Sequence, residues 1–321
     1  FMTGGVKMAD RDYAYAVGRI RVLETKLLPT AFFERLLKAT SAPEALRFLE
    51  ETAYSLDGRT VDYEAAFEEE LFRVYRFLRD LTEDAPELLV FLHRWDLQNL
   101  KLLLVAAGNV QPSRLGVIPF PELKRMVAAM DYPALPPELK AALASLPEAG
   151  PDRAAALDQA YYRYGWRVFG KRAGLLRDCW RARMDLLNLM LFLRLRKRGA
   201  APGELTRFMV EPGFISHHDW RTRFEDPKPD LGLLLENTPY RELLRGGEKI
   251  LTELSSLERA IDDYLLVIAK AAKRVPLGIE PLIGYLLAKE REILNLRLVF
   301  TGLMNKLPEE TVRRRLRDVY L

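Results

Sequence analysis

One octapeptide carries the spacing that organises this chain of 321 residues: Arg94-Trp95-Asp96-Leu97-Gln98-Asn99-Leu100-Lys101. It contains an acidic residue, an asparagine three positions later and a leucine directly after the asparagine. The spacing occurs three times, at Asp96–Asn99–Leu100, Asp185–Asn188–Leu189 and Glu292–Asn295–Leu296. The chain has six asparagines, so half of them fall in this pattern. We call the copies motif 1, motif 2 and motif 3 and infer that they mark a repeat.

The segments around the motifs have the character of amphipathic helices. Apolar residues recur at intervals of three or four in residues 61–82 and 250–271, and residues 152–170 form a third such segment. Signals for β-structure are nearly absent, because no hairpin dipeptide lies between alternating apolar runs and no β-branched run has useful length. The sequence therefore predicts an all-α fold.

The surroundings of the motifs repeat as well. One of the three amphipathic segments precedes each motif, and a tyrosine in a turn-like setting precedes each segment: Tyr54, Tyr132 and Tyr240. Each motif helix stops near a glycine, a residue that commonly ends helices: Gly108, Gly199 and Gly302. We therefore predict three diverged helical repeats, over residues 8–113, 114–203 and 204–321.

The length of the repeats bears on the architecture. A period near 100 residues is too long for ordinary solenoid repeats of ~20–50 residues. Three larger copies predict a pseudo-threefold body whose long helices surround a common axis. The middle copy is the least regular, because prolines divide residues 119–151 into short helices and loops.

Composition narrows the class of protein. The net charge is only +4, from 49 basic and 45 acidic residues that are largely interleaved, which by itself is no signature of nucleic-acid binding. A single cysteine, Cys179, excludes an internal disulfide and fits a reducing compartment, and we expect a buried or half-buried thiol rather than a nucleophile. No apolar run reaches the ~18–20 residues that span a bilayer. Residues 1–7 read as a non-native leader before Met8, so we expect a cytoplasmic protein with only peripheral membrane contact.

Signals for catalysis are weak. Residues 165–171 have the Gly-x4-Gly-Lys frame of a phosphate-binding loop, but Arg172 replaces the Ser or Thr that would hold Mg²⁺ and no strand precedes the frame. His217 and His218 are adjacent, so they cannot bind one metal in the i, i+4 manner of helical zinc sites. We therefore expect no catalytic residues, no metal and no cofactor.

The motif residues have two open roles. The acid and the asparagine share one helix face, and an asparagine inside a helix costs up to ~0.7 kcal/mol relative to alanine. They either cross-link helices and satisfy loop backbone groups, or line a central polar cavity. Preceding arginines suit both roles. The candidate residues are Arg94, Asp96, Asn99, Arg183, Asp185, Asn188, Arg291, Glu292 and Asn295.

Two basic clusters leave an alternative open. Residues 194–198 fit a helix C-terminus that complements the helix dipole. For residues 313–317 two roles are equally plausible: the same complement to a helix dipole, or contact with an acidic partner. The alternative function is an all-helical scaffold that binds nucleic acid or another acidic partner through the basic C-terminal helix. A helical hydrolase with scattered carboxylates is a further alternative, although no nucleophile, base and orienting group stand out.

The order of motifs resembles the C subunit of the V/A-type rotary ATPases, the counterpart of the eukaryotic d subunit. The resemblance extends from Met8 over essentially the full length. Residues 119–151 match least, and Glu292 departs from the aspartate of the other copies. The resemblance rests on Tyr13-Ala14-Tyr15-Ala16-Val17-Gly18-Arg19-Ile20-Arg21, Leu27-Leu28-Pro29, Phe32-Phe33, Leu46-Arg47-Phe48-Leu49, Thr52-Ala53-Tyr54, residues 94–101 and Lys289-Glu290-Arg291-Glu292-Ile293-Leu294-Asn295-Leu296-Arg297.

This resemblance implies a funnel-shaped, threefold pseudosymmetric body with a central cavity. The protein would be a non-catalytic central-stalk subunit, part of the rotor, at the inner face of the cell membrane. Its partners would be the central shaft subunits of D and F type and the membrane rotor ring of proteolipid subunits, with no nucleic acid expected. It would couple ATP synthesis or hydrolysis to proton or sodium transport as a socket between shaft and ring.

Overall fold

The computed structural model describes residues 13–52, 54, 62–105, 111–148, 150–171, 173–241, 243 and 254–321. Every regular element in these ranges is helical and none is a strand, which confirms the predicted all-α fold. The predicted leader, residues 1–7, and Gly108 lie outside the described ranges. The chain divides into two compact units, residues 1–84 with 266–321 and residues 85–265.

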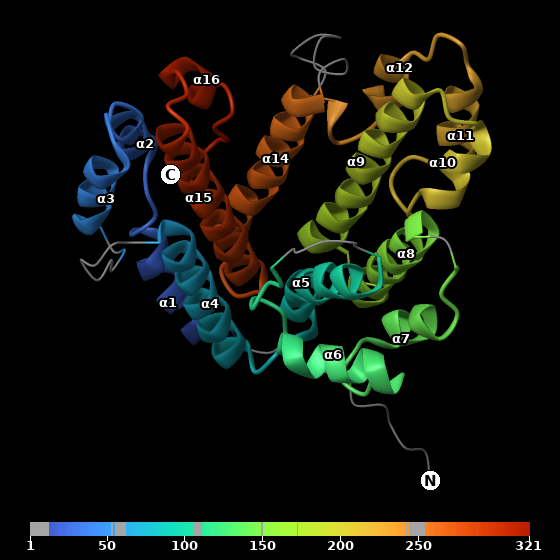
Figure 1. Ribbon diagram of the computed structural model, residues 1–321, viewed down its shortest axis with the longest axis horizontal. Coiled ribbons are helices and arrows are strands. Elements are labelled where there is room, and N and C mark those ends of the chain that lie inside the picture. Colours follow the sequence, from blue (N-terminus) through green and yellow to red (C-terminus); the bar gives the residue numbers. More distant parts are fainter. Residues whose placement is uncertain are drawn as a thin grey trace. The chain divides into compact units, whose positions relative to one another are not determined.

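The first unit joins the two ends of the chain. The long helix α15 packs against α1, α3, α4, η2 and α16, and α16 packs against α2. In Figure 1, α15, in red, lies beside α1 and α4, in blue and teal. The helices of this unit are α1 (Ala14–Glu24), α2 (Thr30–Leu37), α3 (Ala42–Glu50), α4 (Tyr63–Thr82), η2 (Ala272–Arg274), α15 (Glu280–Met304) and α16 (Glu309–Arg313).

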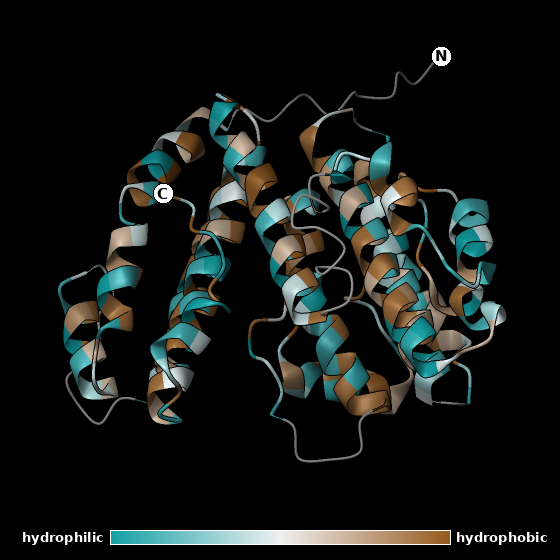
Figure 2. Cartoon of the chain, turned by 90° about the horizontal axis from the view of Figure 1, so that it is seen from above, coloured by the Kyte–Doolittle hydropathy of each residue, from teal (hydrophilic) through white to brown (hydrophobic). Residues whose placement is uncertain are grey.

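Local chemistry sets the ends of α4 and gives it one buried face. The Asp62 side chain accepts a hydrogen bond from the backbone N–H of Ala65 at 3.2 Å and caps the helix start. Glu83 adopts the left-handed conformation at the other end, with φ of 49°. The apolar residues at intervals of three and four are buried between these ends. Figure 2 shows that the long helices carry both hydrophobic and hydrophilic residues along their length.

The second unit is built on α5, α8 and α9. Helix α5 packs against α6 and α8, α8 packs against α7 and α9, and α10 packs against α8, α9 and α11. The helices are α5 (Pro86–Leu104), α6 (Phe120–Ala129), α7 (Pro137–Ala144), α8 (Gly150–Phe169), α9 (Leu175–Arg198), α10 (Pro202–Phe208), α11 (His217–Glu225), α12 (Leu231–Glu236) and most of α14 (Leu254–Ala271).

An aromatic cluster fixes the contact between α8 and α9. Trp180 is fully buried and its ring lies 5.3–6.0 Å from the ring centroids of Phe91, Tyr161, Tyr162 and Phe169. A Cβ atom at Gly165 would lie 2.1 Å from this indole, so only glycine fits there. The Gly-x4-Gly-Lys frame is helical through Phe169, and its first glycine allows α8 and α9 to pack closely.

The predicted helix ends have two different physical causes. Gly199 caps α9 with φ of 69°, and its N–H donates to the carbonyl of Arg196 at 3.0 Å. Gly302 lies inside α15, where a Cβ atom would come within 2.4 Å of Val312. Gly302 therefore allows the close approach of α16, and α15 ends two residues later.

The compact units do not begin where the predicted repeats begin. The first boundary falls at residues 84 and 85, directly before the helix of motif 1. Helix α5 packs on α6 and α8 from the following repeat, and α9 packs on α10 at the start of the third. Helix α15, from the third repeat, packs on α1, α3 and α4 from the first. The repeat boundaries themselves stay a prediction.

Candidate functional site

Motif 1 binds the loop that follows its own helix. Asp96 is fully buried and accepts hydrogen bonds from the backbone N–H groups of Val117 and Ile118, both at 3.1 Å. The Nδ1 atom of His93 lies 2.8 Å from the same carboxylate. The Asn99 amide exchanges two hydrogen bonds with the backbone of Ser113, at 2.8 and 3.0 Å.

Motif 2 repeats this geometry. Asp185 accepts hydrogen bonds from the N–H of Phe214 at 2.5 Å, the N–H of Ile215 at 3.2 Å and the hydroxyl of Tyr240 at 2.6 Å. The amide of Asn188 exchanges two hydrogen bonds with the backbone of Val210, at 2.8 and 2.9 Å. Both motif residues are buried.

Motif 3 does the same with two segments: its acid binds a segment near the other end of the chain, and its asparagine binds one that follows its own helix. Glu292 accepts hydrogen bonds from the N–H of Leu28 at 2.5 Å and from the hydroxyl of Tyr54 at 2.6 Å. The ammonium group of Lys289 lies 2.8 Å from the carboxylate. The Asn295 amide exchanges two hydrogen bonds with the backbone of Arg317, both at 2.9 Å.

The three carboxylates bind equivalent backbone positions. In each motif one bound N–H belongs to the residue directly before a helix N-cap: Ile118 before Pro119 of α6, Ile215 before Ser216 of α11, and Leu28 before Pro29 of α2. Such N–H groups have no partner within the helix that follows. Each motif therefore fixes the start of a helix near the beginning of a predicted repeat: α6 in repeat 2, α11 in repeat 3 and α2 in repeat 1.

Side-chain length at the acid is matched by the loop opposite. A Cβ atom at Gly116 would lie 2.3 Å from Asp96, and one at Gly213 would lie 1.9 Å from Asp185. Both glycines lie two residues before the bound N–H, where motif 3 has Lys26. Glutamate is longer by one methylene, and Glu292 binds the N–H of Leu28 at 2.5 Å from a loop that carries a side chain at this position. We infer that the longer acid compensates for the missing glycine, which accounts for Glu292 where the other copies have aspartate.

The predicted tyrosines meet two of the three carboxylates. Burial and the adjacent carboxylate raise the pKa of Tyr54 and of Tyr240, so both hydroxyls stay protonated donors. Burial also raises the pKa of Asp185, although the bonds from Tyr240 and the loop backbone oppose this. His93 takes the corresponding place at Asp96, whose hydrogen bonds are to His93, Val117 and Ile118.

The three arginines beside the motifs are half-buried. The Arg94 guanidinium lies 4.8 Å from the Trp95 ring, and that of Arg183 lies 5.7 Å from Phe91. Burial raises the pKa of the Tyr162 hydroxyl, and the charges of Arg183 and Arg94 both oppose this rise. The charges of two of the three predicted arginines therefore act on the same side chain, Tyr162. Arg291 belongs to the other unit.

The chemistry available at these sites is that of holding backbone in place. Within the described ranges, no group of three or more His, Cys, Asp or Glu side chains is arranged to hold a metal ion. Cys179 is buried, and burial raises the pKa of its thiol to about 11. Each carboxylate instead accepts two or three bonds, and each amide satisfies one donor and one acceptor of the backbone.

Most of the basic residues in the two clusters have acidic or carbonyl partners. Arg313 lies 2.6 Å from both Glu34 and Glu309, and Arg314 pairs with Glu310. In the other cluster Arg194 pairs with Glu258, Arg198 pairs with Glu204, and Arg196 donates to the carbonyls of Phe224 and Pro227. These contacts leave fewer charges for nucleic acid.

Sequence reasoning missed the loops that receive the carboxylates. The signal is Gly116-Val117-Ile118 repeated as Gly213-Phe214-Ile215, each directly before a helix. The first copy, Lys26-Leu27-Leu28, lacks the glycine, so the pattern is obscured there.

Fold and site define a class: an all-helical protein in which three related buried motifs hold helix starts in a recurring order. The sequence pattern of the ATP synthase (C/AC39) subunit family matches residues 16–315. The chain belongs to this family, which confirms the resemblance seen in its motifs.

Individual relatives match over almost their whole length. The chain is 27% identical to the C subunit of the A-type ATP synthase of Methanosarcina mazei, over 96% of this chain and 93% of that protein. It is 26% identical to the C subunit of the V-type sodium ATPase of Enterococcus hirae, over 94% and 97%. It is 24% identical to the C subunit of the A-type ATP synthase of Archaeoglobus fulgidus, over 95% and 96%. None of the helices in the described ranges has the length and apolarity needed to cross a bilayer.

Proposed function

We propose that this protein is a non-catalytic central-stalk subunit of a rotary ATPase or ATP synthase, and that it works as a socket between the central shaft and the membrane rotor ring. The observation that carries the proposal is the order of the motifs. Motif 1 binds Ile118 in predicted repeat 2, motif 2 binds Ile215 in predicted repeat 3, and motif 3 returns to Leu28 in predicted repeat 1. Three related repeats joined in this cyclic order are expected to enclose a central space.

A funnel of helices suits a mechanical role. A socket that transmits torque needs a wall that does not yield, and buried hydrogen bonds to backbone at three equivalent places stiffen the junctions between units. The family supports this interpretation, since the relatives bear the names of ATP synthase and ATPase subunits. ATP and ion chemistry would then belong to other subunits of the complex.

The lining of the socket would come from the arginines, because the motif acids and asparagines are used internally. Arg94, Arg183 and Arg291 are half-buried beside their motifs and carry charge that an acidic shaft end could meet. Polar contacts of this kind give register and allow reversible docking, whereas geometry transmits force. The wider end would receive the D- and F-type shaft subunits, and the other end would rest on the proteolipid ring at the inner face of the membrane, with protons or sodium ions as the transported species.

Co-purification tests this function. The chain would be tagged in its own organism, and the membranes would be solubilised in mild detergent. We expect the tag to recover shaft subunits and a proteolipid ring together. Recovery of the chain alone, or with nucleic acid that is released by salt, would overturn the proposal.

A charge variant tests the socket lining. Replacing Arg94 and Arg183 by glutamine keeps most of the side-chain volume and removes two charges. We expect at least about tenfold weaker binding of the purified shaft subunits, with the helical circular dichroism signal retained. Arg125→Gln on α6 serves as the control for a single exposed charge. Unchanged shaft affinity in the double variant would remove both arginines from the socket.

A further inference from the structure

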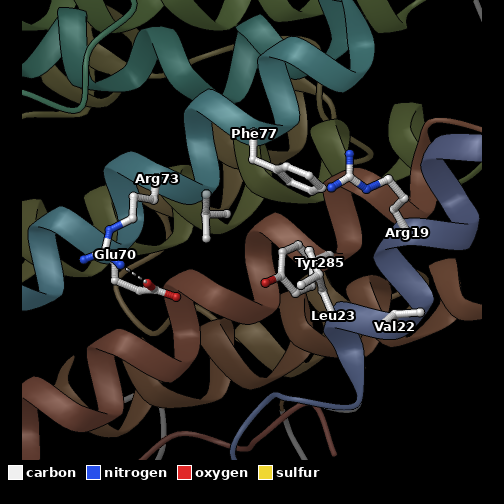
Figure 3. Close-up of a pocket in the computed structure, with 8 residues that line it drawn as sticks. Arg19, Val22, Leu23, Glu70, Arg73, Phe77 and Tyr285 are labelled. Carbon is white, nitrogen blue, oxygen red and sulfur yellow. Dashed lines mark ion pairs between the residues drawn. The ribbon is translucent and has the colours of Figure 1, made fainter. Parts of the chain in front are cut away.

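A second surface, in the first unit, has the features of a binding site. A pocket of about 400 Å³ opens between α1, α4 and α15, and its walls are largely apolar (Figure 3). This volume is in the range of pockets that bind ligands or anchor side chains. The lining residues include Arg19, Val22, Glu70, Arg73, Phe77 and Tyr285.

Tyr285 contributes a polar group to this pocket. The side chain is only 4% exposed. Its hydroxyl forms no hydrogen bond with any residue in the described part of the chain, and in Figure 3 it lies in the space between α15 and α4. The hydroxyl oxygen is accessible from the pocket, so an occupant with a polar backbone or side-chain group can form a hydrogen bond with it.

Arg19 contributes a positive charge at the rim. Its guanidinium lies 4.7 Å from the centre of the Phe77 ring and 5.9 Å from that of Tyr15. Within the described ranges no carboxylate lies within ion-pair distance of it, whereas Arg73, at the other end of the pocket, has Glu69 at 3.5 Å. An arginine held on an aromatic ring is pre-organised to bind a carboxylate.

The apolar surface continues outside the pocket along α1. Tyr15 is 74% exposed and Val22 is 61% exposed. Together with Arg19 they lie at intervals of four and three residues and therefore share one face of the helix. Tyrosine and arginine are the residue types that dominate binding at protein interfaces. A small amphiphile inside the pocket would leave this face uncovered, and a protein segment would cover it.

We propose that this pocket and the adjoining face of α1 bind a helical segment of a partner protein. The segment inserts one bulky apolar side chain between α1, α4 and α15, and it places a carboxylate, one helical turn away, on Arg19. This is recognition of an amphipathic helix by a groove, with one charge to set its direction. The proposal does not depend on the socket, because Arg19 and Tyr285 are not motif residues, although Glu70 of the pocket wall shares Lys289 with Glu292.

A displayed peptide library tests the proposal on the full-length chain. The library would present helical peptides with all surface positions randomised, and binders would be measured by fluorescence anisotropy. We expect enriched peptides to carry a large apolar residue and an aspartate or glutamate three or four positions away. Arg19→Glu should weaken their binding at least about tenfold, and Tyr285→Phe should weaken it several-fold.

The matched control is Arg76→Glu. Arg76 is also an exposed arginine near an aromatic ring, Phe72, at 6.0 Å, but it does not line the pocket. The Arg76→Glu variant should bind the enriched peptides as tightly as the wild type does. Circular dichroism checks that each variant is folded.

Three outcomes would overturn the proposal: no peptide enriched above an unrelated helical protein, enriched peptides whose binding is unchanged by Arg19→Glu, or displacement of every peptide by millimolar octanoate that itself binds with the same dependence on Arg19 and Tyr285. The last result would assign the pocket to a small amphiphilic carboxylate.

Discussion

At the scale of single residues, hydrogen bonds offset the cost of placing polar side chains inside the motif helices. An asparagine in a helix interior costs up to ~0.7 kcal/mol relative to alanine. Each motif asparagine instead makes two buried or partly buried hydrogen bonds to backbone outside its helix, each contributing about 1 kcal/mol net. The acids beside them are buried and are stabilised by N–H and hydroxyl donors. The gain therefore exceeds the cost at all three sites.

The contact between Gly213 and Asp185 gives the first stability prediction. In Gly213→Ala the new Cβ would lie 1.9 Å from a buried carboxylate oxygen, so the loop or the acid must move. We expect a loss of about 2 kcal/mol or more in the free energy of unfolding, measured by urea denaturation. The control is Gly203→Ala in α10, where no heavy atom lies within 4 Å of the Cβ position. That change should be neutral or stabilising by up to ~1 kcal/mol. Equal effects of the two substitutions would contradict the proposed contact.

Cys179 gives a prediction that depends on pH. Because burial raises the pKa of its thiol to about 11, only about one molecule in a thousand carries the reactive thiolate at pH 8. We expect a disulfide reagent to leave the native protein unmodified at pH 8 and to react at once in urea. The thiolate fraction rises as the pH approaches 11, so the native rate should rise with it. Rapid modification at pH 7 would show that the thiol is accessible.

At the scale of elements, the sequence predicts the helices well. The expected segments 61–82 and 152–170 are found as α4 and α8, and α14 covers the described part of 250–271. The repeat of acid, asparagine and leucine also locates the three buried sites, because a polar group inside a long apolar helix must have a partner. What could not be predicted is which loop each motif binds. The partner of Glu292 lies at Leu28, and only tertiary structure brings such distant residues together.

The role of Tyr132 was also beyond the reach of the pattern. It has the sequence position of Tyr54 and Tyr240, but His93, one helical turn before Asp96, supplies the third contact in motif 1. Tyr132 lies in the proline-rich segment 119–151, the part of the chain in which the repeat is least regular.

A double-mutant cycle tests the match between acid length and loop distance in motif 3. Glu292→Asp withdraws the carboxylate by one methylene from the N–H of Leu28. We expect it to cost about 2 kcal/mol in the free energy of unfolding. In a Lys26→Gly background the loop can approach as it does at Gly116 and Gly213, so the same change should cost less than half as much. Costs that add within ~0.5 kcal/mol would contradict the coupling.

At the scale of the whole molecule, the cyclic order of the motifs is the link between fold and proposed function. Motif 3 joins the last long helix to the first loop of the chain, and the first compact unit accordingly contains both ends. A protein with three consecutive repeats in an open row would have no reason to hold its first loop from its last helix. We therefore propose that the three repeats form a closed ring around a cavity.

Distances between spin labels on the three motif helices test this claim most directly. Gln98, Leu187 and Leu294 each lie two residues after the motif acid, so a threefold arrangement makes them equivalent. Cysteines would be placed there in pairs, with the buried Cys179 remaining unlabelled. Pulsed electron spin resonance should then give three similar distances for the pairs 98–187, 187–294 and 98–294. One distance far longer than the other two would describe an open row of helices and would contradict the ring.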